Sequence, residues 1–235
     1  MVISLLFKVF LVALACSFIL TGCTTTKQAR DVKHKGYLVD ASILSKGGEG
    51  EALYRYLNPK ADWASYSNIL LDPVITLRQA ELAKEGLPRE DLQRMANNFY
   101  ALIYKELDED YEMVKMPGPR TLRVQVALTD LQASWATTDT VTSVIPVGIA
   151  LSASKDFITG KPAFVGEASV EVKVTDARTG QLLGAGIDRR VGGDQIEASV
   201  DSWDDVNKIM GLWSKWFRFR LCKLRGERDC FSPDK

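Results

Sequence analysis

The segment that decides the fold reads Leu122-Arg123-Val124-Gln125-Val126-Ala127-Leu128-Thr129. Apolar and mainly polar residues alternate, so each kind projects from its own face of the backbone, as in a half-buried β-strand. Residues 168–174 repeat the alternation, and Leu183, Ala185 and Ile187 predict a returning strand. Between these two strands, residues 176–180 form a turn signal in which Gly180 supplies a positive φ. These features predict an antiparallel meander or paired hairpins.

Two segments carry apolar residues at three- and four-residue spacing, which is typical of helices with one buried face. The first helix begins near Pro88, and Ser202 with Asp205 resembles a capping box for the second. Long alternation with only two such helices predicts an α+β fold: a mainly antiparallel sheet with two amphipathic helices packed on one face. Pro73 places a further strand, over residues 66–75, at an edge or a bulge. The two apolar stripes comprise Leu92, Met95, Phe99, Leu102, Ile103 and Leu107, then Trp203, Val206, Met210, Trp213, Phe217 and Leu221.

The N-terminus predicts an exported lipoprotein. The apolar run over residues 9–20 would make a helix of roughly 18 Å, too short for a hydrocarbon core of about 30 Å. It ends in Leu20-Thr21-Gly22-Cys23, the pattern of a lipoprotein signal peptide that is cleaved before a lipidated cysteine. Residues 1–22 are therefore expected to be removed. A signal peptide normally begins with a positively charged region, but here Lys8 is the single cation before the end of the apolar run. The alternative is therefore that the segment stays uncleaved and acts as a membrane anchor.

If Cys23 is lipidated, the location of the protein in the cell envelope and the boundaries of its domain can be predicted. Three acyl chains would attach the protein permanently to a membrane, since one chain alone anchors only marginally. Thr24 follows Cys23 where Asp would favour the inner membrane, so we expect the periplasmic face of the outer membrane of a Gram-negative bacterium. Residues 23–36 are interpreted as the lipidated cysteine and a polar tether reaching at most about 40 Å. Residues 37–235 are expected to form a single α+β domain.

The charge balance bears on the kind of partner, and the cysteines bear on disulfide formation. The chain has 30 basic and 30 acidic residues, a balance that argues against a nucleic-acid partner. Cys222 and Cys230 are the cysteines left after the signal peptide and the lipidation site, and an oxidising periplasm predicts that they form a disulfide. The alternative, a redox or metal pair, lacks C-x-x-C spacing and a nearby histidine.

The sequence offers no reactive constellation, so neither an enzyme nor a cofactor is expected. His34 is the sole histidine and lies in the tether, which excludes Ser-His-Asp catalysis and most zinc sites. Ser152-Ala153-Ser154-Lys155 matches S-x-x-K, but the companion motifs of penicillin-binding enzymes are absent. Gly184-x-Gly186 lacks the third glycine of a dinucleotide loop, and residues 47–50 are interpreted as a flexible turn. Two acidic pairs, Asp108 with Asp110 and Asp204 with Asp205, are interpreted as solvated helix ends rather than glycosidase pairs.

Two surfaces are candidates for binding. Residues 141–153 are apolar without helical or strand periodicity, so they are either an exposed patch that meets a partner or part of the core. The end of the last helix, residues 213–225, is aromatic and basic. It is interpreted as a core helix whose long cations reach the surface, with contact to lipid head groups or a partner as the alternative. The residues predicted to form the first surface are Val144, Ile145, Val147, Ile149 and Leu151.

A set of short motifs, together with the lipidation signal, resembles the Gram-negative lipoprotein family known as DUF3313, a domain of unknown function. The resemblance spans roughly residues 36–221 and implies an envelope lipoprotein without an assigned activity or catalytic residues. Besides residues 122–133, its motifs are Gly36-Tyr37-Leu38-x-Asp40, Ile69-Leu70-Leu71-Asp72-Pro73-Val74, Gly86-Leu87, Pro117-Gly118-Pro119 and Val174-Thr175-Asp176-Ala177-Arg178-Thr179-Gly180.

These observations predict a lipid-anchored, periplasm-facing envelope protein with a non-enzymatic binding or scaffolding role. Its partners would be the membrane, through the acyl chains on Cys23, and an envelope protein. A carboxylate-based envelope hydrolase is one alternative, and a deep pocket lined by two or more carboxylates would favour it. An accessory lipoprotein of a transport or export machine is the other.

Overall fold

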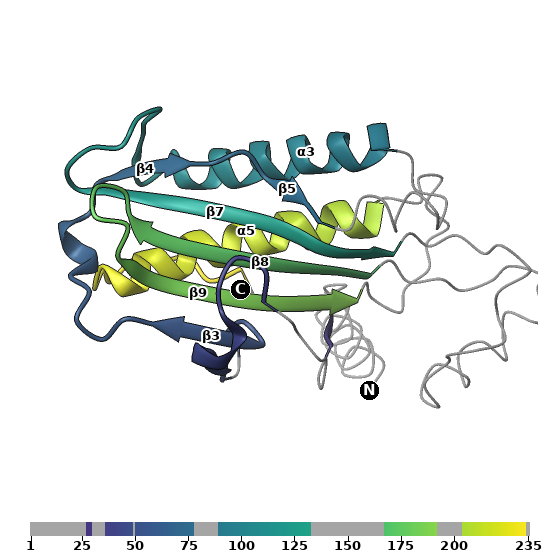
Figure 1. Cartoon of the computed structure of the whole chain (residues 1–235), viewed down its shortest axis with the longest axis horizontal. Coiled ribbons are helices and arrows are strands. Elements are labelled where there is room, and N and C mark those ends of the chain that lie inside the picture. The colour runs from purple at the N-terminus through teal and green to yellow at the C-terminus, as the bar shows by residue number, and fades with distance from the viewer. Residues whose placement is uncertain are drawn as a thin grey trace, which may run out of the picture.

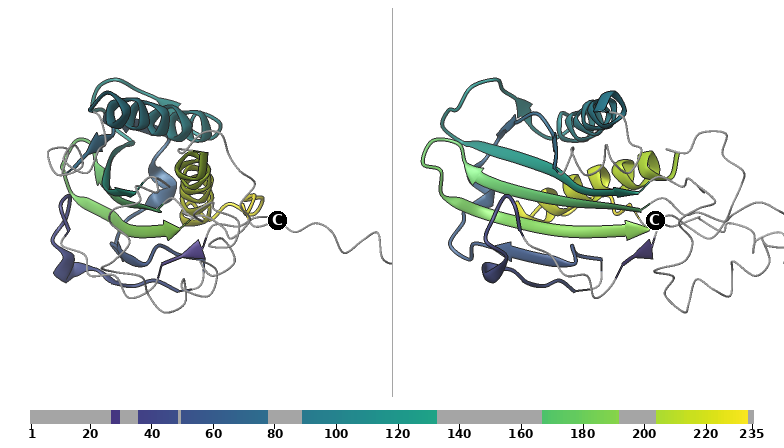
Figure 2. Two further views of the ribbon diagram at one scale, coloured as in Figure 1. Left: turned by 90° about the vertical axis from the view of Figure 1, so that its right-hand side faces the viewer. Right: turned by 45° about the vertical axis from the view of Figure 1, so that its right-hand side comes forward.

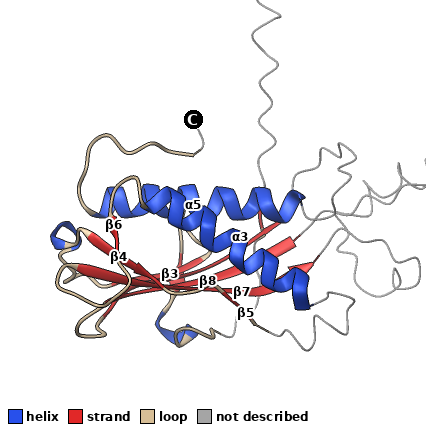
Figure 3. Cartoon of the chain, turned by 90° about the horizontal axis from the view of Figure 1, so that it is seen from above, coloured by secondary structure: helices blue, strands red, loops and turns tan. Residues whose placement is uncertain are grey.

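The computed structural model describes residues 27–29, 36–48, 50–77, 89–132, 167–191 and 204–233. Within these residues nine strands form one sheet, and two long helices run along one side of it (Figures 1, 2 and 3). The predicted α+β class, with a mostly antiparallel sheet and two helices on one face, is confirmed. Among the described residues, none of the helices is long and apolar enough to cross a bilayer.

The three longest strands form the centre of the sheet. They are β7 (Thr121–Gln132), β8 (Glu167–Asp176) and β9 (Leu182–Val191), each antiparallel to the next. The predicted turn joins β8 to β9. Asp176 Oδ1 accepts the amide N–H groups of Arg178 and Thr179 at 3.0 and 2.7 Å, and Gly180 has a φ of +73°, the left-handed value predicted for it.

Shorter strands extend the sheet on both sides. On one side β3 (Tyr54–Leu57) pairs antiparallel with β9, and β2 (Ser45–Lys46) pairs with β3. On the other side β4 (Asn68–Leu71) and β5 (Ile75–Thr76) run parallel to β7, and β6 (Glu112–Met113) runs parallel to β4. The strand predicted over residues 66–75 is therefore split at Pro73, which has no backbone N–H to donate.

The two helices are α3 (Arg89–Leu107) and α5 (Asp204–Leu224). They pack against each other through the rings of Phe99 and Trp213, whose centroids are 6.1 Å apart. Leu102 and Phe217 of the predicted stripes are half-buried, and Trp203 lies outside the described residues. The other stripe residues are buried: Leu92, Met95, Phe99, Ile103, Leu107, Val206, Met210, Trp213 and Leu221.

The C-terminal part of α5 is attached to the rest of the domain. Arg218 donates to both oxygens of Asp110 at 2.8 and 2.9 Å, and these hydrogen bonds raise the pKa of Arg218. The expected disulfide is present between Cys222 and Cys230, with their Cα atoms 5.8 Å apart. The basic side chains here pair within the domain, as expected of a core helix whose cations reach the surface.

The N-terminal segments lie against β8 and β9 on the side away from the helices (Figure 1). Near the short 3₁₀ helix η1 (Ala41–Ile43), the amides of Tyr37 and Leu38 donate to Glu171 Oε2 at 2.7 and 2.9 Å, which explains how Glu171 is buried as a carboxylate. Inside the predicted tether, β1 (Lys27–Gln28) pairs with β9. The chain thus meets the sheet at Lys27, four residues after Cys23 and earlier than the predicted domain boundary.

Candidate binding pocket

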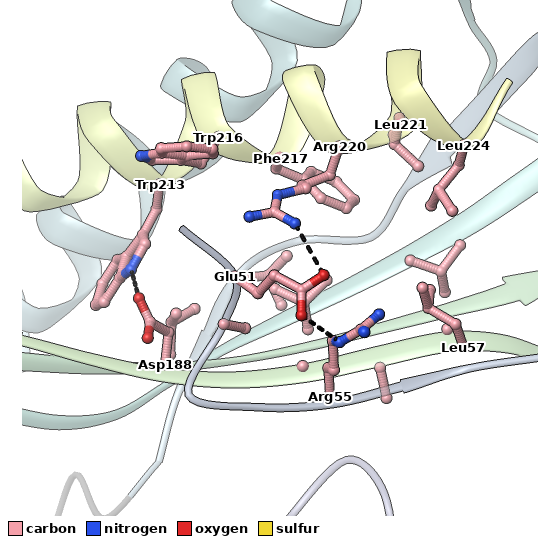
Figure 4. A pocket seen from close by; sticks show the side chains of 18 of the residues that line it. Glu51, Arg55, Leu57, Asp188, Trp213, Trp216, Phe217, Arg220, Leu221 and Leu224 are labelled. Carbon is pink, nitrogen blue, oxygen red and sulfur yellow. Dashed lines mark hydrogen bonds and ion pairs between the residues drawn. The ribbon is translucent and has the colours of Figure 1, made fainter. Parts of the chain in front are cut away.

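A cavity of about 340 Å³ lies between the helix-facing side of the sheet and α5 (Figure 4). That volume is at the small end of the range for small-molecule sites, about 300–1,000 Å³. The lining is mainly apolar and aromatic. It comprises Gly50, Glu51, Ala52, Arg55, Leu57, Trp63, Phe99, Ile103, Val126, Val170, Val172, Val174, Gly184, Ala185, Gly186, Asp188, Arg190, Trp213, Trp216, Phe217, Arg220, Leu221, Lys223 and Leu224.

Two glycines on β9 create the space. Residues paired across neighbouring strands project on the same face of a sheet. In one row Val126 of β7 pairs with Val172 of β8, which pairs with Gly186 of β9. In another row, Val174 of β8 pairs with Gly184. The valines project towards the helices from β7 and β8 and line the cavity, whereas β9 presents no side chain at these two positions.

The surroundings of these glycines show how much room each has. A Cβ atom on Gly184 would lie 3.2 Å from Cη2 of Trp63, which is a tight contact. On Gly186 it would lie 3.4 Å from the Cβ of Ala52, an ordinary van der Waals distance. Position 186 can therefore accept a side chain, which would project into the cavity.

Aromatic residues of α5 form the opposite wall (Figure 4). Trp213 is buried, and its indole N–H donates to Asp188 Oδ2 at 2.7 Å. The ring of Trp216 stands close to Gly50, where a Cβ atom would lie 3.4 Å from its Cη2. Gly50 has a φ of +66°, so both its backbone and the nearby ring favour glycine. The indole N–H of Trp216 is buried with no acceptor in the described parts of the chain.

Asp188 connects four segments at one end of the cavity. Besides Trp213, it accepts the side-chain amide of Gln28 at 2.5 Å and the backbone N–H of Leu53 at 3.1 Å, and it pairs with Arg190 Nε at 3.1 Å. The residue is only 6% exposed. A buried carboxyl group needs hydrogen-bond donors, and these donors come from β1, the residue before β3, β9 and α5, so Asp188 holds the four segments together.

Glu51 lies between two arginines at the rim (Figure 4). Its Oε2 atom is 2.6 Å from Arg55 Nε, and its Oε1 atom is 3.4 Å from Arg220 Nη1. The contact with Arg55 is close but lacks hydrogen-bond alignment. Oε2 also accepts the N–H of Gly48 at 2.8 Å. Burial lowers the pKa of Arg220, which the charge of Glu51 opposes, and the guanidinium lies 5.1 Å from the centre of the Trp216 ring.

Comparison with known proteins identifies the family. A family profile described as "Protein of unknown function (DUF3313)" matches residues 33–217. The chain belongs to the DUF3313 family. The resemblance expected from the short motifs is confirmed. No curated protein matches the chain significantly.

Several solved structures resemble the DUF3313 fold at low sequence identity. The PelC dodecamer from Paraburkholderia phytofirmans is 6% identical with a TM-score of 0.38, over 74% of this chain and 96% of that one. The hypothetical protein CT253 from Chlamydia trachomatis is 15% identical with a TM-score of 0.37, over 68% and 96%. Lipoprotein GNA1162 from Neisseria meningitidis is 13% identical with a TM-score of 0.27, over 67% and 99%. Similarity this distant supports no statement about function.

The pocket contains few of the residues singled out in the sequence. Cys23, His34, the Ser152–Lys155 motif and the surface from Val144 to Leu151 lie outside the described residues. Of the acidic pairs, Asp110 is bound to Arg218, while Asp204 and Asp205 begin α5. Within the described parts of the chain there is no group of three side chains suited to a metal ion.

Sequence reasoning missed Glu51, Arg55 and Asp188 because they come from separate strands and loops. The spacing of Gly184 and Gly186 was a usable signal. Two glycines at alternate positions of a strand remove two side chains from the same face. This pattern indicates a gap under whatever covers that face, rather than an incomplete nucleotide loop.

Proposed function

We propose that this DUF3313 protein is a lipid-anchored, non-enzymatic binding protein of the periplasmic face of the outer membrane. Its pocket would take an apolar ligand. The observation that carries the proposal is the cavity of about 340 Å³ with an apolar and aromatic lining under α5. An apolar pocket with a few convergent polar groups is the usual form of a small-molecule site.

The glycines that open the pocket support a role in binding. A glycine inside a strand is less stable than alanine by roughly 0.5–1 kcal/mol, because it loses more backbone freedom on folding. Gly184 and Gly186 both carry this cost. At position 184 the ring of Trp63 packs closely, whereas at position 186 an added Cβ atom would meet only ordinary contacts. The chain therefore gives up stability in order to keep the space open, which is expected where a ligand uses it.

Binding can be tested with a neutral fluorescent probe, N-phenyl-1-naphthylamine. Trp213 and Trp216 line the cavity, so energy transfer from tryptophan to the probe reports occupancy. The full chain would be placed in phospholipid nanodiscs and compared with a Gly186→Leu variant, whose side chain fills the cavity. Gly211→Ala is the matched control, because Gly211 lies on α5 outside the lining. We expect transfer in the wild type and the control and its loss in Gly186→Leu; equal transfer in all three would refute the proposal.

Attachment through Cys23 requires its own test. Inhibiting lipoprotein signal peptidase should leave a larger precursor, and a Cys23→Ser variant should fail to incorporate radiolabelled palmitate. Unchanged gel mobility under the inhibitor would contradict the proposed anchor. A protein partner in the envelope, including one in a transport or export machine, is a further part of the proposal. Cross-linking from Val147 in cells tests it by whether one specific protein is recovered.

One observation favours the alternative of a carboxylate-based hydrolase: Glu51 and Asp188 both line the pocket. Glycoside hydrolysis needs one carboxyl group that is protonated and free to act as an acid. Here Asp188 accepts from Gln28, Leu53 and Trp213, and Glu51 is held by Gly48 and two arginines. Both carboxyl groups are engaged by donors within the domain, so neither is free to act on a substrate, and we favour the binding role. Hydrolysis of a glycan or ester substrate that is lost in Glu51→Gln would reverse that preference.

A further inference from the structure

The lining of the pocket has an excess of positive charge. Four basic residues, Arg55, Arg190, Arg220 and Lys223, stand against two acidic ones, a balance of +2. The direct partners of Asp188 are Arg190, Trp213, Gln28 and Leu53, so it acts on Arg220 only as a charge at longer range. A ligand that fits this pocket is therefore expected to combine an apolar body with a negative group.

Glu51 marks where the negative group would sit. Its carboxylate lies between Arg55 and Arg220, but the contact to Arg220 is 3.4 Å, longer than the 2.7–2.9 Å of a strong charge-assisted hydrogen bond. Arg220 is partly buried and lines the cavity, so an anion in the cavity could approach its guanidinium. Gly48 and Gly50 both precede Glu51, and glycines permit the backbone changes that would let its side chain move aside.

The pocket also lies close in sequence to the proposed anchor. Gln28 donates its side-chain amide to Asp188 Oδ1 at 2.5 Å and to the backbone carbonyl of Glu51 at 2.9 Å, and both of these residues line the cavity. Four residues lie between Cys23 and Gln28, so the two are at most about 18 Å apart along an extended chain. A lipidated Cys23 would hold the pocket next to the bilayer, where amphiphiles are abundant.

We propose that the pocket binds a single-chain amphiphile with an anionic head group, drawn from the membrane. The acyl chain lies over Gly184 and Gly186 against α5, and the head group displaces the Glu51 carboxylate from Arg55 and Arg220. A cavity of about 340 Å³ suits one chain rather than a two-chain lipid. This inference rests on the proposed binding function and adds the class of ligand.

The test uses two photoreactive probes of the same length and different charge. Diazirine-bearing palmitic acid carries a carboxylate, and the matched diazirine-bearing hexadecanol is neutral. The full chain in phosphatidylcholine nanodiscs would be irradiated with each, and adducts mapped by mass spectrometry to the peptides around Val172 and Phe217. The Gly186→Leu variant, whose side chain is expected to fill the cavity, gives the level of labelling that does not depend on the pocket. We expect the acid to label the pocket of the wild type about tenfold more than the alcohol, the effect of gaining one charge-assisted contact.

Variants then locate the head group. Arg220→Gln should lower labelling by the acid about tenfold and leave labelling by the alcohol unchanged. Glu51→Gln, which removes the internal competitor, should raise labelling by the acid. Lys215→Gln is the matched control, because this exposed cation of α5 lies outside the lining. Arg55→Gln replaces Arg220→Gln if the latter fails to fold.

The outcomes separate the two proposals. Equal labelling of the wild-type pocket by acid and alcohol, insensitive to Arg220→Gln, would overturn the anionic ligand and leave apolar binding in place. Labelling by both probes no greater than in Gly186→Leu would overturn the binding function itself, and the anionic ligand with it. The comparison of the two probes needs only the wild-type chain, so it does not depend on any variant folding.

Discussion

The helix-facing side of the sheet has two halves, one on β7 and β8 and one on β9, which differ in the size of their side chains. On β7 and β8 it carries Val124, Val126, Val172 and other branched residues, which fill the space under the helices. On β9 the same rows continue with Gly184 and Gly186, and the space under α5 is empty. Both halves lie on the helix-facing side of one sheet, so the difference lies in the side chains that they present.

The comparison shows that the pocket depends on two residues in a sheet that is otherwise a packed core. The packed half supplies the stability, because each buried apolar side chain contributes roughly 1.5–3 kcal/mol relative to its exposed state. The open half gives up part of that contribution and gains a cavity. A mutation in the packed half should therefore change stability, and a mutation in the open half should change binding.

The largest effect is expected from Leu122→Ala in the packed half. Leu122 is fully buried, and removing it leaves a cavity lined by residues that cannot all move in. The free energy of unfolding should fall by about 4 kcal/mol. Urea unfolding followed by tryptophan fluorescence measures it. A loss below about 1 kcal/mol would mean that the packed half is not packed as described.

The next effect concerns Asp188, the carboxylate of the open half that binds β9 to α5. In Asp188→Ala the indole N–H of Trp213 and the guanidinium of Arg190 lose a buried acceptor. We expect the free energy of unfolding to fall by about 3 kcal/mol, since donors left without partners cost more than the bond itself contributes. The same urea experiment, with Asp110→Ala as a more exposed comparison, checks this. Equal losses in both variants would show that Asp188 has no special role.

The sequence predicted the packed half well and the open half poorly. Periodicity reports which residues face a core, so β7, β8 and both helical stripes could be found from residues such as Val126 and Phe99. The split at Pro73 and the two-residue strand β1 are set by pairing with distant strands, which local patterns do not contain. The return strand was predicted from Leu183, Ala185 and Ile187, but the cavity lies over Gly184 and Gly186 at the alternate positions of β9. The charged rim consists of Glu51 and Arg55 together with Arg220, which is far from them in sequence, so no local motif could predict it.

The disulfide lies outside both halves of the sheet, so removing it should change stability without changing binding. Cys222 and Cys230 close a short loop after the last turn of α5. Replacing both with alanine should lower the free energy of unfolding by about 2 kcal/mol, mainly through the greater freedom of the unfolded chain. Binding of the naphthylamine probe should not change. A loss of binding in this variant would show that the end of α5 needs the disulfide to shape the pocket.

The smallest effect is at the turn that connects the two halves. Desolvation raises the pKa of Asp176, but hydrogen bonds from Thr179, Tyr66 and Arg178 outweigh it, so the pKa lies below its usual value of 3.8. A lowered pKa in the folded state contributes stability above pH 4 that is lost as the pH falls through the lowered value. Urea unfolding between pH 5 and 2.5 should show a shallower loss of stability in Asp176→Asn than in the wild type. Identical slopes would mean that the turn does not depend on the charge.

The most direct test of the central claim is the stability of Gly186→Val. If the space above Gly186 is open, valine continues the row formed by Val126 and Val172, and the free energy of unfolding should stay the same or rise by up to about 1 kcal/mol. If side chains already fill that space, the extra methyl groups would overpack it and lower the free energy by about 1–3 kcal/mol. Urea unfolding of this variant beside the wild type distinguishes the two results. A clear loss would contradict the existence of the pocket.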